Sequence, residues 1–158
     1  GITNPAKAIK TLNCIRLAEP FENLRLEVEK SNKTPKVFLL TFGNLAMRKA
    51  RAGFATNFFA VAGYEIIDNP GFDTAQEGAK AALESKADIV VLCSSDEEYA
   101  ELVSGVMPEL RGKINHVVVA GNPIEQIENF KNQGITDFIS VKTNCLESLQ
   151  NYNGLLLK

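Results

Sequence analysis

Short apolar segments alternate with amphipathic segments from residue 37 onward, and this alternation limits the fold more than any other feature of the sequence. The apolar segments suited to strands are 37–41, 64–67, 89–93, 117–120 and 138–141. Strands separated by helical segments imply right-handed crossovers and a mostly parallel sheet with helices on both faces. We therefore predict an α/β fold of the flavodoxin-like (Rossmann-like) type, with a five-stranded parallel sheet in the order 2-1-3-4-5.

The chain length suits a single domain preceded by a short connecting segment. Domains cluster around ~100–150 residues, and this chain has 158. Residues 1–18 show no sustained hydrophobic periodicity, so we interpret them as a linker or strap and place the domain at 19–158. Phe21, Leu24 and Val28 recur at helical spacing and predict an N-terminal helix over 20–30.

The charge balance and the hydropathy argue against several classes of partner. Seventeen basic and nineteen acidic residues give a formal net charge of −2, which provides no general field for nucleic acid or an anionic membrane. No apolar run reaches the ~18–20 residues of a membrane span, and the N-terminus lacks the pattern of a signal peptide. The sequence therefore indicates a cytoplasmic protein with no nucleic-acid partner and no membrane partner.

Ligands of this fold type bind in the loops after the first, third and fourth strands, here 42–46, 93–97 and 120–123. A phosphate-binding turn requires several glycines, whereas the first loop contains only Gly43. A magnesium-dependent receiver site requires an aspartate where Cys93 and Ser94 stand. A flavin phosphate site requires a turn rich in hydroxyl groups, which this loop lacks. The sequence therefore matches none of these sites.

Neither catalysis nor metal binding is predicted from the titratable residues. His116 is the only histidine, and it precedes the fourth predicted strand, at the end of the sheet opposite to the ligand loops. A metal site needs several ligands, and a catalytic constellation needs a positioned base, so we predict no metal ligand and no catalytic residue. Cys93 ends a buried strand without a neighbouring base or cation, and we interpret it as a packing residue.

The helix predicted over 47–61 presents an apolar stripe that we expect to face the sheet. The stripe consists of residues spaced by three or four: Met47, Ala50, Phe54, Phe58 and Val61. Between them lie Arg48, Lys49 and Arg51, which we interpret as a solvated or interfacial face because the start of a helix disfavours cations.

Acidic residues follow the third strand, where the next helix is expected to begin. We interpret Asp96, Glu97 and Glu98 as helix caps, and we expect Ser95 to form a capping box with Glu98. After the fourth strand, Ile124 is predicted to lie on the inner face of another helix.

Three stretches of the chain together resemble one family. They are RLAEPFENLR at 16–25, FGNLAMRKARAGFATNFFAVAGYEII at 42–67 and VVVAGNP at 117–123. They resemble the cobalamin-binding-type C-terminal domain of methylmalonyl-CoA mutases, and within that family the domain of the small subunit. The resemblance covers almost the whole chain, and the helix following Gly43 is its most specific part.

The resemblance implies an adenosylcobalamin-dependent isomerase that interconverts methylmalonyl-CoA and succinyl-CoA. Cobalamin-competent domains of the family carry D-x-H-x-x-G after the first strand, S-x-L after the third and G-G after the fourth. Here the first loop offers neither the aspartate nor the histidine, and Asn44 or Leu45 stands where the cobalt ligand belongs. Vestigial cleft positions remain at Gly43, Asn44, Ser94, Ser95 and Gly121. We therefore expect no cofactor bound by this domain, and we expect Leu45 and Met47 to fill the cleft.

Three hypotheses of function follow. The first is a non-catalytic module of the small subunit that packs against its own upstream barrel domain and the catalytic large subunit in a heterodimer. The second is a working cobalamin carrier that binds the cofactor without a histidine, in a base-on manner. The third is a stand-alone small-ligand binder of the flavodoxin type.

Overall fold

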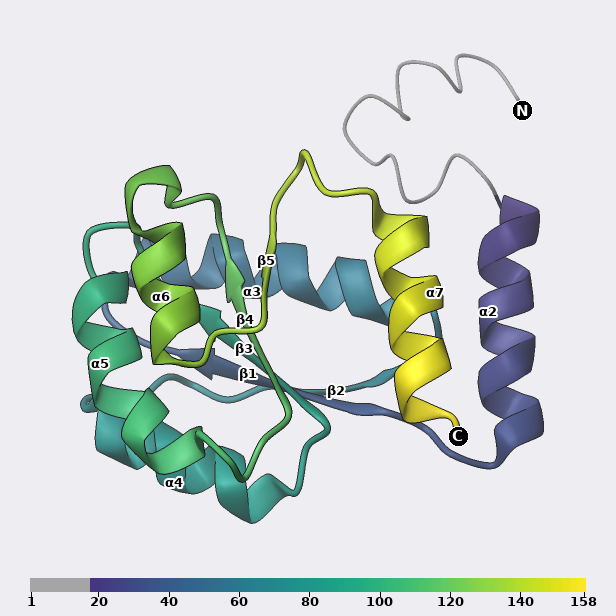
Figure 1. Ribbon diagram of the computed structural model, residues 1–158, viewed down its shortest axis with the longest axis horizontal. Coiled ribbons are helices and arrows are strands. Elements are labelled where there is room, and N and C mark those ends of the chain that lie inside the picture. Colours follow the sequence, from purple (N-terminus) through teal and green to yellow (C-terminus); the bar gives the residue numbers. More distant parts are fainter. Residues whose placement is uncertain (1–17) are drawn as a thin grey trace.

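A computed structural model describes residues 18–158 and confirms the predicted fold class (Figure 1). Five parallel strands pair in the order β2-β1-β3-β4-β5. The strands are β1 (Lys36–Thr41), β2 (Glu65–Ile67), β3 (Ile89–Cys93), β4 (His116–Ala120) and β5 (Asp137–Ile139). The chain order reverses direction between β1 and β3, so the loops after these two strands lie side by side at the carboxyl edge of the sheet.

Helices cover both faces of the sheet. On one face lie α2 (Ala18–Ser31), α3 (Leu45–Ala60) and α7 (Cys145–Leu156). On the other face lie α4 (Ala75–Ser85), α5 (Tyr99–Leu110) and α6 (Ile127–Gln133), the last preceded by the short helix η2 (Ile124–Gln126). Within residues 18–158, no helix combines the length and the apolar character that a membrane span requires.

Side chains of alternate strand residues pack into two separate hydrophobic cores, one on each face of the sheet. Val37 and Leu39 of β1 pack under α3, whereas Phe38 and Leu40 pack on the other side against α4. All four side chains are buried. A strand buried on both faces reads as a continuous apolar run, and this explains why β1 and β3 were predictable from sequence.

The N-terminal helix α2 contains the predicted helix 20–30 and packs on α7. Phe21 and Leu24 are buried at this contact. Asn153 of α7, also buried, donates to the backbone carbonyl of Leu24 and accepts a hydrogen bond from the Tyr64 hydroxyl at 2.6 Å. The strap predicted for 1–18 lies outside the described residues except at its last position.

Three local predictions were wrong. The buried side chains of α3 are Ala52, Ala55, Phe58 and Phe59, so the stripe is rotated from the predicted one and Ala50 is exposed. β5 ends at Ile139, the last residue paired with β4, and Val141 is 74% exposed. Ile124 lies in η2 and is 71% exposed, because the regular helix begins only at Ile127.

Candidate functional site

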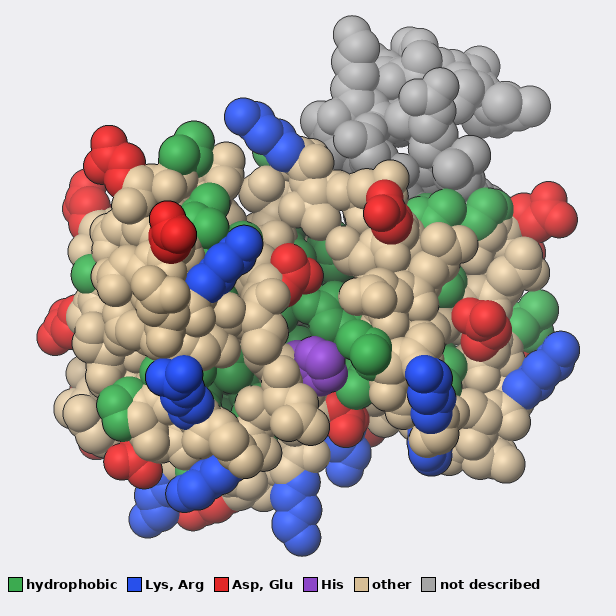
Figure 2. All heavy atoms as spheres, viewed as in Figure 1, with side chains coloured by type: hydrophobic (Ala, Val, Ile, Leu, Met, Phe, Trp, Pro, Cys, Tyr) green, Lys and Arg blue, Asp and Glu red, His purple; other side chains and the backbone are tan. Residues whose placement is uncertain are grey.

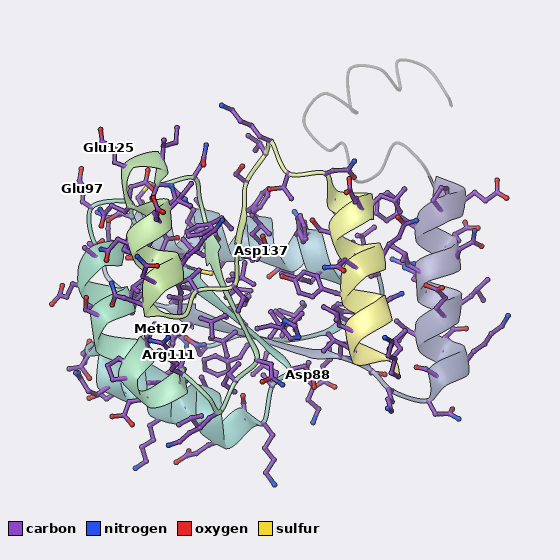
Figure 3. The ribbon with its side chains drawn as sticks, in the orientation of Figure 1. Asp88, Glu97, Met107, Arg111, Glu125 and Asp137 are labelled. Carbon is purple, nitrogen blue, oxygen red and sulfur yellow. The ribbon has the colours of Figure 1, made fainter. Side chains whose placement is uncertain are left out.

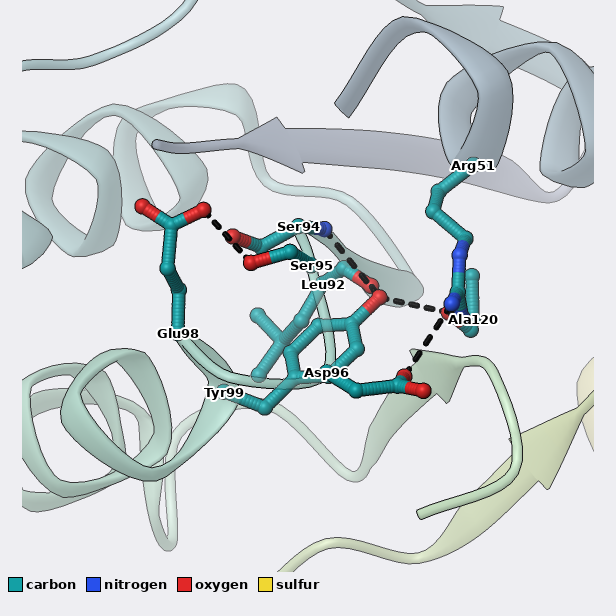
Figure 4. A network of polar contacts seen from close by, with 8 residues as sticks. All are labelled: Arg51, Leu92, Ser94, Ser95, Asp96, Glu98, Tyr99 and Ala120. Carbon is teal, nitrogen blue, oxygen red and sulfur yellow. Dashed lines mark hydrogen bonds and ion pairs between the residues drawn. The ribbon is translucent and has the colours of Figure 1, made fainter. Parts of the chain in front are cut away.

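The three loops predicted to form a ligand cleft do come together at the carboxyl edge of the sheet, and side chains of the protein itself occupy the space between them (Figure 4). Thr41, Cys93 and Ala120 end the three strands that carry these loops. Hydrogen bonds join the first loop to the start of α5, and α3 to the end of β4. The cleft is therefore cross-linked rather than open.

The Glu98 carboxylate occupies the space beside Gly43. Its Oε1 accepts hydrogen bonds from the backbone N–H of Asn44 at 2.8 Å and from the Ser95 hydroxyl at 2.6 Å. Gly43 has a positive φ of 81°, and a Cβ placed on it would lie 2.1 Å from Glu98 Oε2. The room left by the absent side chain of Gly43 is thus taken by a carboxylate from another helix.

The Arg51 guanidinium occupies the equivalent space beside Gly121. Its Nη1 donates to the carbonyl oxygen of Ala120 at 2.6 Å, and its Nη2 lies 3.0 Å from Asp96 Oδ1. A Cβ on Gly121 would lie 1.9 Å from Nη1. Arg51 therefore crosses the cleft from α3 to β4, and its side chain is only 19% exposed.

Tyr99 forms the buried floor of this network. Its hydroxyl accepts from the Ser94 N–H at 3.1 Å and lies within hydrogen-bonding distance of the carbonyl oxygens of Leu92 and Ala120. The Arg51 guanidinium lies over the ring, 5.9 Å from its centroid. Burial is the main cause that raises the pKa of the Tyr99 hydroxyl above its ordinary value, so the group stays protonated.

The remaining vestigial positions serve local structure. The Asn44 side chain caps α3 by accepting from the Met47 N–H at 3.0 Å. The Ser95 hydroxyl donates a hydrogen bond to Glu98 Oε1. The Ser94 hydroxyl is buried and has no hydrogen-bond partner among the described residues. Cys93 is a free thiol, buried as predicted, and burial raises its pKa above the ordinary range.

Several interpretations of these loops are corrected by the structure. Arg51 is not on a solvated face, and Arg48 donates to the carbonyl oxygens of Gly43 and Pro70. Glu98 does not cap its own helix with its side chain, and Asp96 pairs with Arg51. Leu45 does not fill the cleft, because it is 54% exposed. The cleft is closed by charged side chains rather than by apolar ones.

Two surface hollows within residues 18–158 bear on the predicted positions. One, of about 480 Å³, is what remains of the cleft and is lined by Met47, Ser95 and the acidic residues 96–98 together with Asn44. The larger, of about 720 Å³, lies between the start of β5 and α7 and includes His116 and Tyr152. Figure 2 shows the histidine, in purple, at the centre of that hollowed face. His116 thus lies at the amino end of its strand, as predicted, away from the ligand loops.

Glu98 gives the cleft a predictable dependence on pH. Hydrogen bonds from the Ser95 hydroxyl and then the Asn44 N–H hold the pKa of its carboxyl below the ordinary value. A lowered folded-state pKa contributes stability above the unfolded-state pKa, about 4.3, and loses it as the pH falls through the folded-state value. We expect Glu98→Gln to cost about 1 kcal/mol of unfolding free energy near neutral pH, since the carboxylate is partly exposed.

Urea denaturation of both proteins from about pH 7 to about pH 3 measures this effect. The difference between wild type and Glu98→Gln is expected to shrink below about pH 4. Glu97→Gln is the matched control, because Glu97 is exposed and forms none of these contacts. A difference that does not vary with pH contradicts the assignment.

The residues present do not fit a cobalamin. Its nucleotide tail would have to pass between the three loops, where Glu98 and Arg51 lie. Burying the benzimidazole of that tail against a carboxylate and a guanidinium would deprive both charged groups of water. At the position of the cobalt ligand, Asn44 is engaged as a helix cap and Leu45 has no donor atom. No three His, Cys, Asp or Glu side chains are grouped as metal ligands in the part of the chain that the structure describes.

Fold and cleft together define a flavodoxin-like α/β domain whose ligand loops are closed by its own side chains. No protein-family profile matches the chain. It is 52% identical over 150 residues to the methylmalonyl-CoA mutase small subunit of Porphyromonas gingivalis, an alignment that covers 95% of this chain and 24% of that protein. It is 31% identical to the small subunit of Streptomyces virginiae, with 92% of this chain and 24% of that protein covered.

Almost the whole chain is thus similar to methylmalonyl-CoA mutase small subunits, as its resemblance to that family predicted. A probable small subunit of Mycobacterium bovis is 29% identical, over 86% of this chain and 23% of that protein. The chain thus spans about a quarter of the length of the curated relatives that it matches.

Proposed function

We propose that the domain is a non-catalytic module of the small subunit of an adenosylcobalamin-dependent methylmalonyl-CoA mutase, acting in the cytoplasm. The isomerisation of methylmalonyl-CoA and succinyl-CoA would be carried by the large subunit, and this domain would serve heterodimer assembly and stability. The observation that carries the proposal is the closed cleft, in which Glu98 and Arg51 take the spaces beside Gly43 and Gly121. A domain closed in this way has a surface to offer but no cofactor channel.

The carboxyl edge of the sheet offers such a surface. Three large apolar side chains are exposed in the segments that follow β1, β4 and β5. They are Leu45 at the start of α3, Ile124 in η2, and Val141 after β5. Acidic side chains accompany them, and Figure 3 shows Glu97 and Glu125 pointing outward at this end of the molecule. Exposed apolar side chains accompanied by charged ones are typical of an interaction surface.

The occupant that we propose for this edge is the upstream barrel domain of the same polypeptide. The relatives are about four times longer than this chain, so most of each small subunit lies outside the matched segment. The name small subunit, which the relatives carry, further supports a large-subunit partner. Assembly of this chain with that partner is part of the proposal.

An absorbance titration with hydroxocobalamin tests the closed cleft. We expect no change in the cobalamin spectrum and no co-elution of the corrin with the protein on gel filtration, because no imidazole reaches the cobalt and no channel receives the tail. Free imidazole added to hydroxocobalamin is the positive control for the spectral change. Co-elution with a changed spectrum would instead support the histidine-free carrier, and a different species in native mass spectrometry would support a small-ligand binder.

A further inference from the structure

The groups around the Glu98 carboxylate are arranged as a cradle of hydrogen-bond donors. The Asn44 N–H and the Ser95 hydroxyl both donate to Oε1, and Gly43 leaves the space that Oε2 occupies. The Ser94 hydroxyl is fully buried and without a partner in the described part of the chain. Figure 4 shows both serine hydroxyls directed toward the Glu98 carboxylate.

The cradle lies at the N-terminus of α3, a helix of sixteen residues. The first turn of a helix carries unpaired N–H groups and a partial positive charge, which acidic side chains commonly offset. The first turn of α3 has no acidic residue of its own. Glu98 supplies the missing negative charge from the start of α5, 54 residues further along the chain.

We propose that the β1–α3 turn is a carboxylate-binding site whose resident ligand is the side chain of Glu98, and that the site accepts a small external carboxylate such as formate once that side chain is removed. The donors are the Asn44 N–H and the hydroxyls of Ser94 and Ser95. In the intact protein, the resident ligand keeps external carboxylates out and ties α5 to α3. The Ser94 hydroxyl, which has no partner among the described residues while Glu98 is in place, would be the third donor to an external carboxylate.

The surroundings of the site favour a monovalent carboxylate over phosphate. Formate has the size and planarity of the Glu98 head group, so it fits the space beside Gly43. Asp96 and Glu97 line the same hollow and would repel a dianion. A ligand of three heavy atoms gains little binding energy, so we expect a dissociation constant on the order of 1 mM or weaker.

Thermal unfolding of Glu98→Ala in the whole chain tests the proposal. We expect the melting temperature to fall by about 2–4 °C and sodium formate to restore at least half of that loss in a saturable manner, whereas sodium chloride at equal ionic strength does not. Glu97→Ala is the matched control and should show neither the loss nor the formate-specific recovery. Adding Ser94→Ala to Glu98→Ala should weaken the recovery. Equal recovery with chloride, or none with formate, would overturn the proposal.

NMR provides a second measurement that does not depend on the binding of an external carboxylate. The Asn44 amide proton should shift as the carboxylate that it contacts becomes protonated at low pH, and this titration should vanish in Glu98→Gln but persist in Glu97→Gln. A titration that survives Glu98→Gln would assign the Asn44 amide to another group and would also overturn the proposal. Neither measurement involves cobalamin or a partner subunit, so failure here leaves the proposed function standing.

Discussion

Replacing Tyr99 by alanine is expected to lower the free energy of unfolding by about 3–5 kcal/mol, the range typical of deleting a buried aromatic side chain. Tyr99, the first residue of α5, is fully buried with its hydroxyl at the ends of β3 and β4, and Arg51 lies over its ring. Its hydroxyl also accepts a hydrogen bond from the Ser94 N–H and lies within hydrogen-bonding distance of the carbonyl oxygens of Leu92 and Ala120. The truncation therefore leaves a cavity and unpaired buried polar groups in one place.

Tyr99→Phe separates these two contributions. It keeps the ring and removes the hydroxyl, so we expect a loss of about 1–3 kcal/mol from the buried groups left without a partner. Tyr152→Phe is the matched control. Its hydroxyl donates to Asp137 Oδ2 at 2.9 Å, and that carboxylate is only partly buried, so water can replace the bond.

Urea denaturation at neutral pH measures all three variants. Tyr152→Phe should cost less than about 1 kcal/mol. Should Tyr99→Ala fail to fold, the comparison of the two Phe variants still decides the point. Equal losses of unfolding free energy in Tyr99→Phe and Tyr152→Phe would mean that the hydrogen bonds of the Tyr99 hydroxyl do not stabilise the cleft.

The strands and their order were predictable because burial on both faces imposes a pattern that sequence shows directly. β1 and β3 are uninterrupted apolar runs, and helical segments separate every pair of strands. The residues at which strands end were less predictable. Val141 is β-branched and apolar, yet pairing ends when β4 ends at Ala120, opposite Ile139. The length of the partner strand β4 thus determines where β5 ends.

The facing side of α3 was misjudged because the predicted stripe was offset from the buried one: it included Ala50 and omitted Phe59. Ala52 and Ala55 are buried against the sheet, whereas the larger Phe54 is only partly buried. Small side chains allow a helix to approach closely, so their burial reflects geometry that hydrophobicity alone does not reveal.

The location of the cleft was predictable, but its contents were not. Topology alone places the three loops together. The contacts that close them join residues far apart in sequence, such as Asn44 with Glu98 and Arg51 with Asp96. Local rules assigned Glu98 to a capping box and Arg51 to the surface, because they consider only neighbours within one helical turn. Gly43 and Gly121 indicated in the sequence that space lies beside the backbone. The structure shows that Glu98 and Arg51 fill that space.

Placing a charge on the exposed carboxyl edge is expected to disrupt docking while leaving the fold of this domain intact. Ile124 is 71% exposed, so Ile124→Asp should change the stability of the isolated chain by no more than about 0.5 kcal/mol. In the full-length small subunit, the same aspartate would be buried without a partner at the proposed contact with the upstream barrel. A cost of about 2 kcal/mol or more is expected, equivalent to roughly 30-fold in docking.

Limited proteolysis of the full-length small subunit, alone and co-expressed with the large subunit, measures this loss as faster cleavage upstream of α2 and a lower yield of the assembled pair. Leu26→Asp is the matched control, because Leu26 is also exposed, at 46%, but lies on α2 at the opposite side of the domain from η2 (Figure 1). The two substitutions introduce the same charge in place of similar side chains. Equal effects of Ile124→Asp and Leu26→Asp would show that the carboxyl edge is not the docking surface, since only the location of the charge distinguishes them.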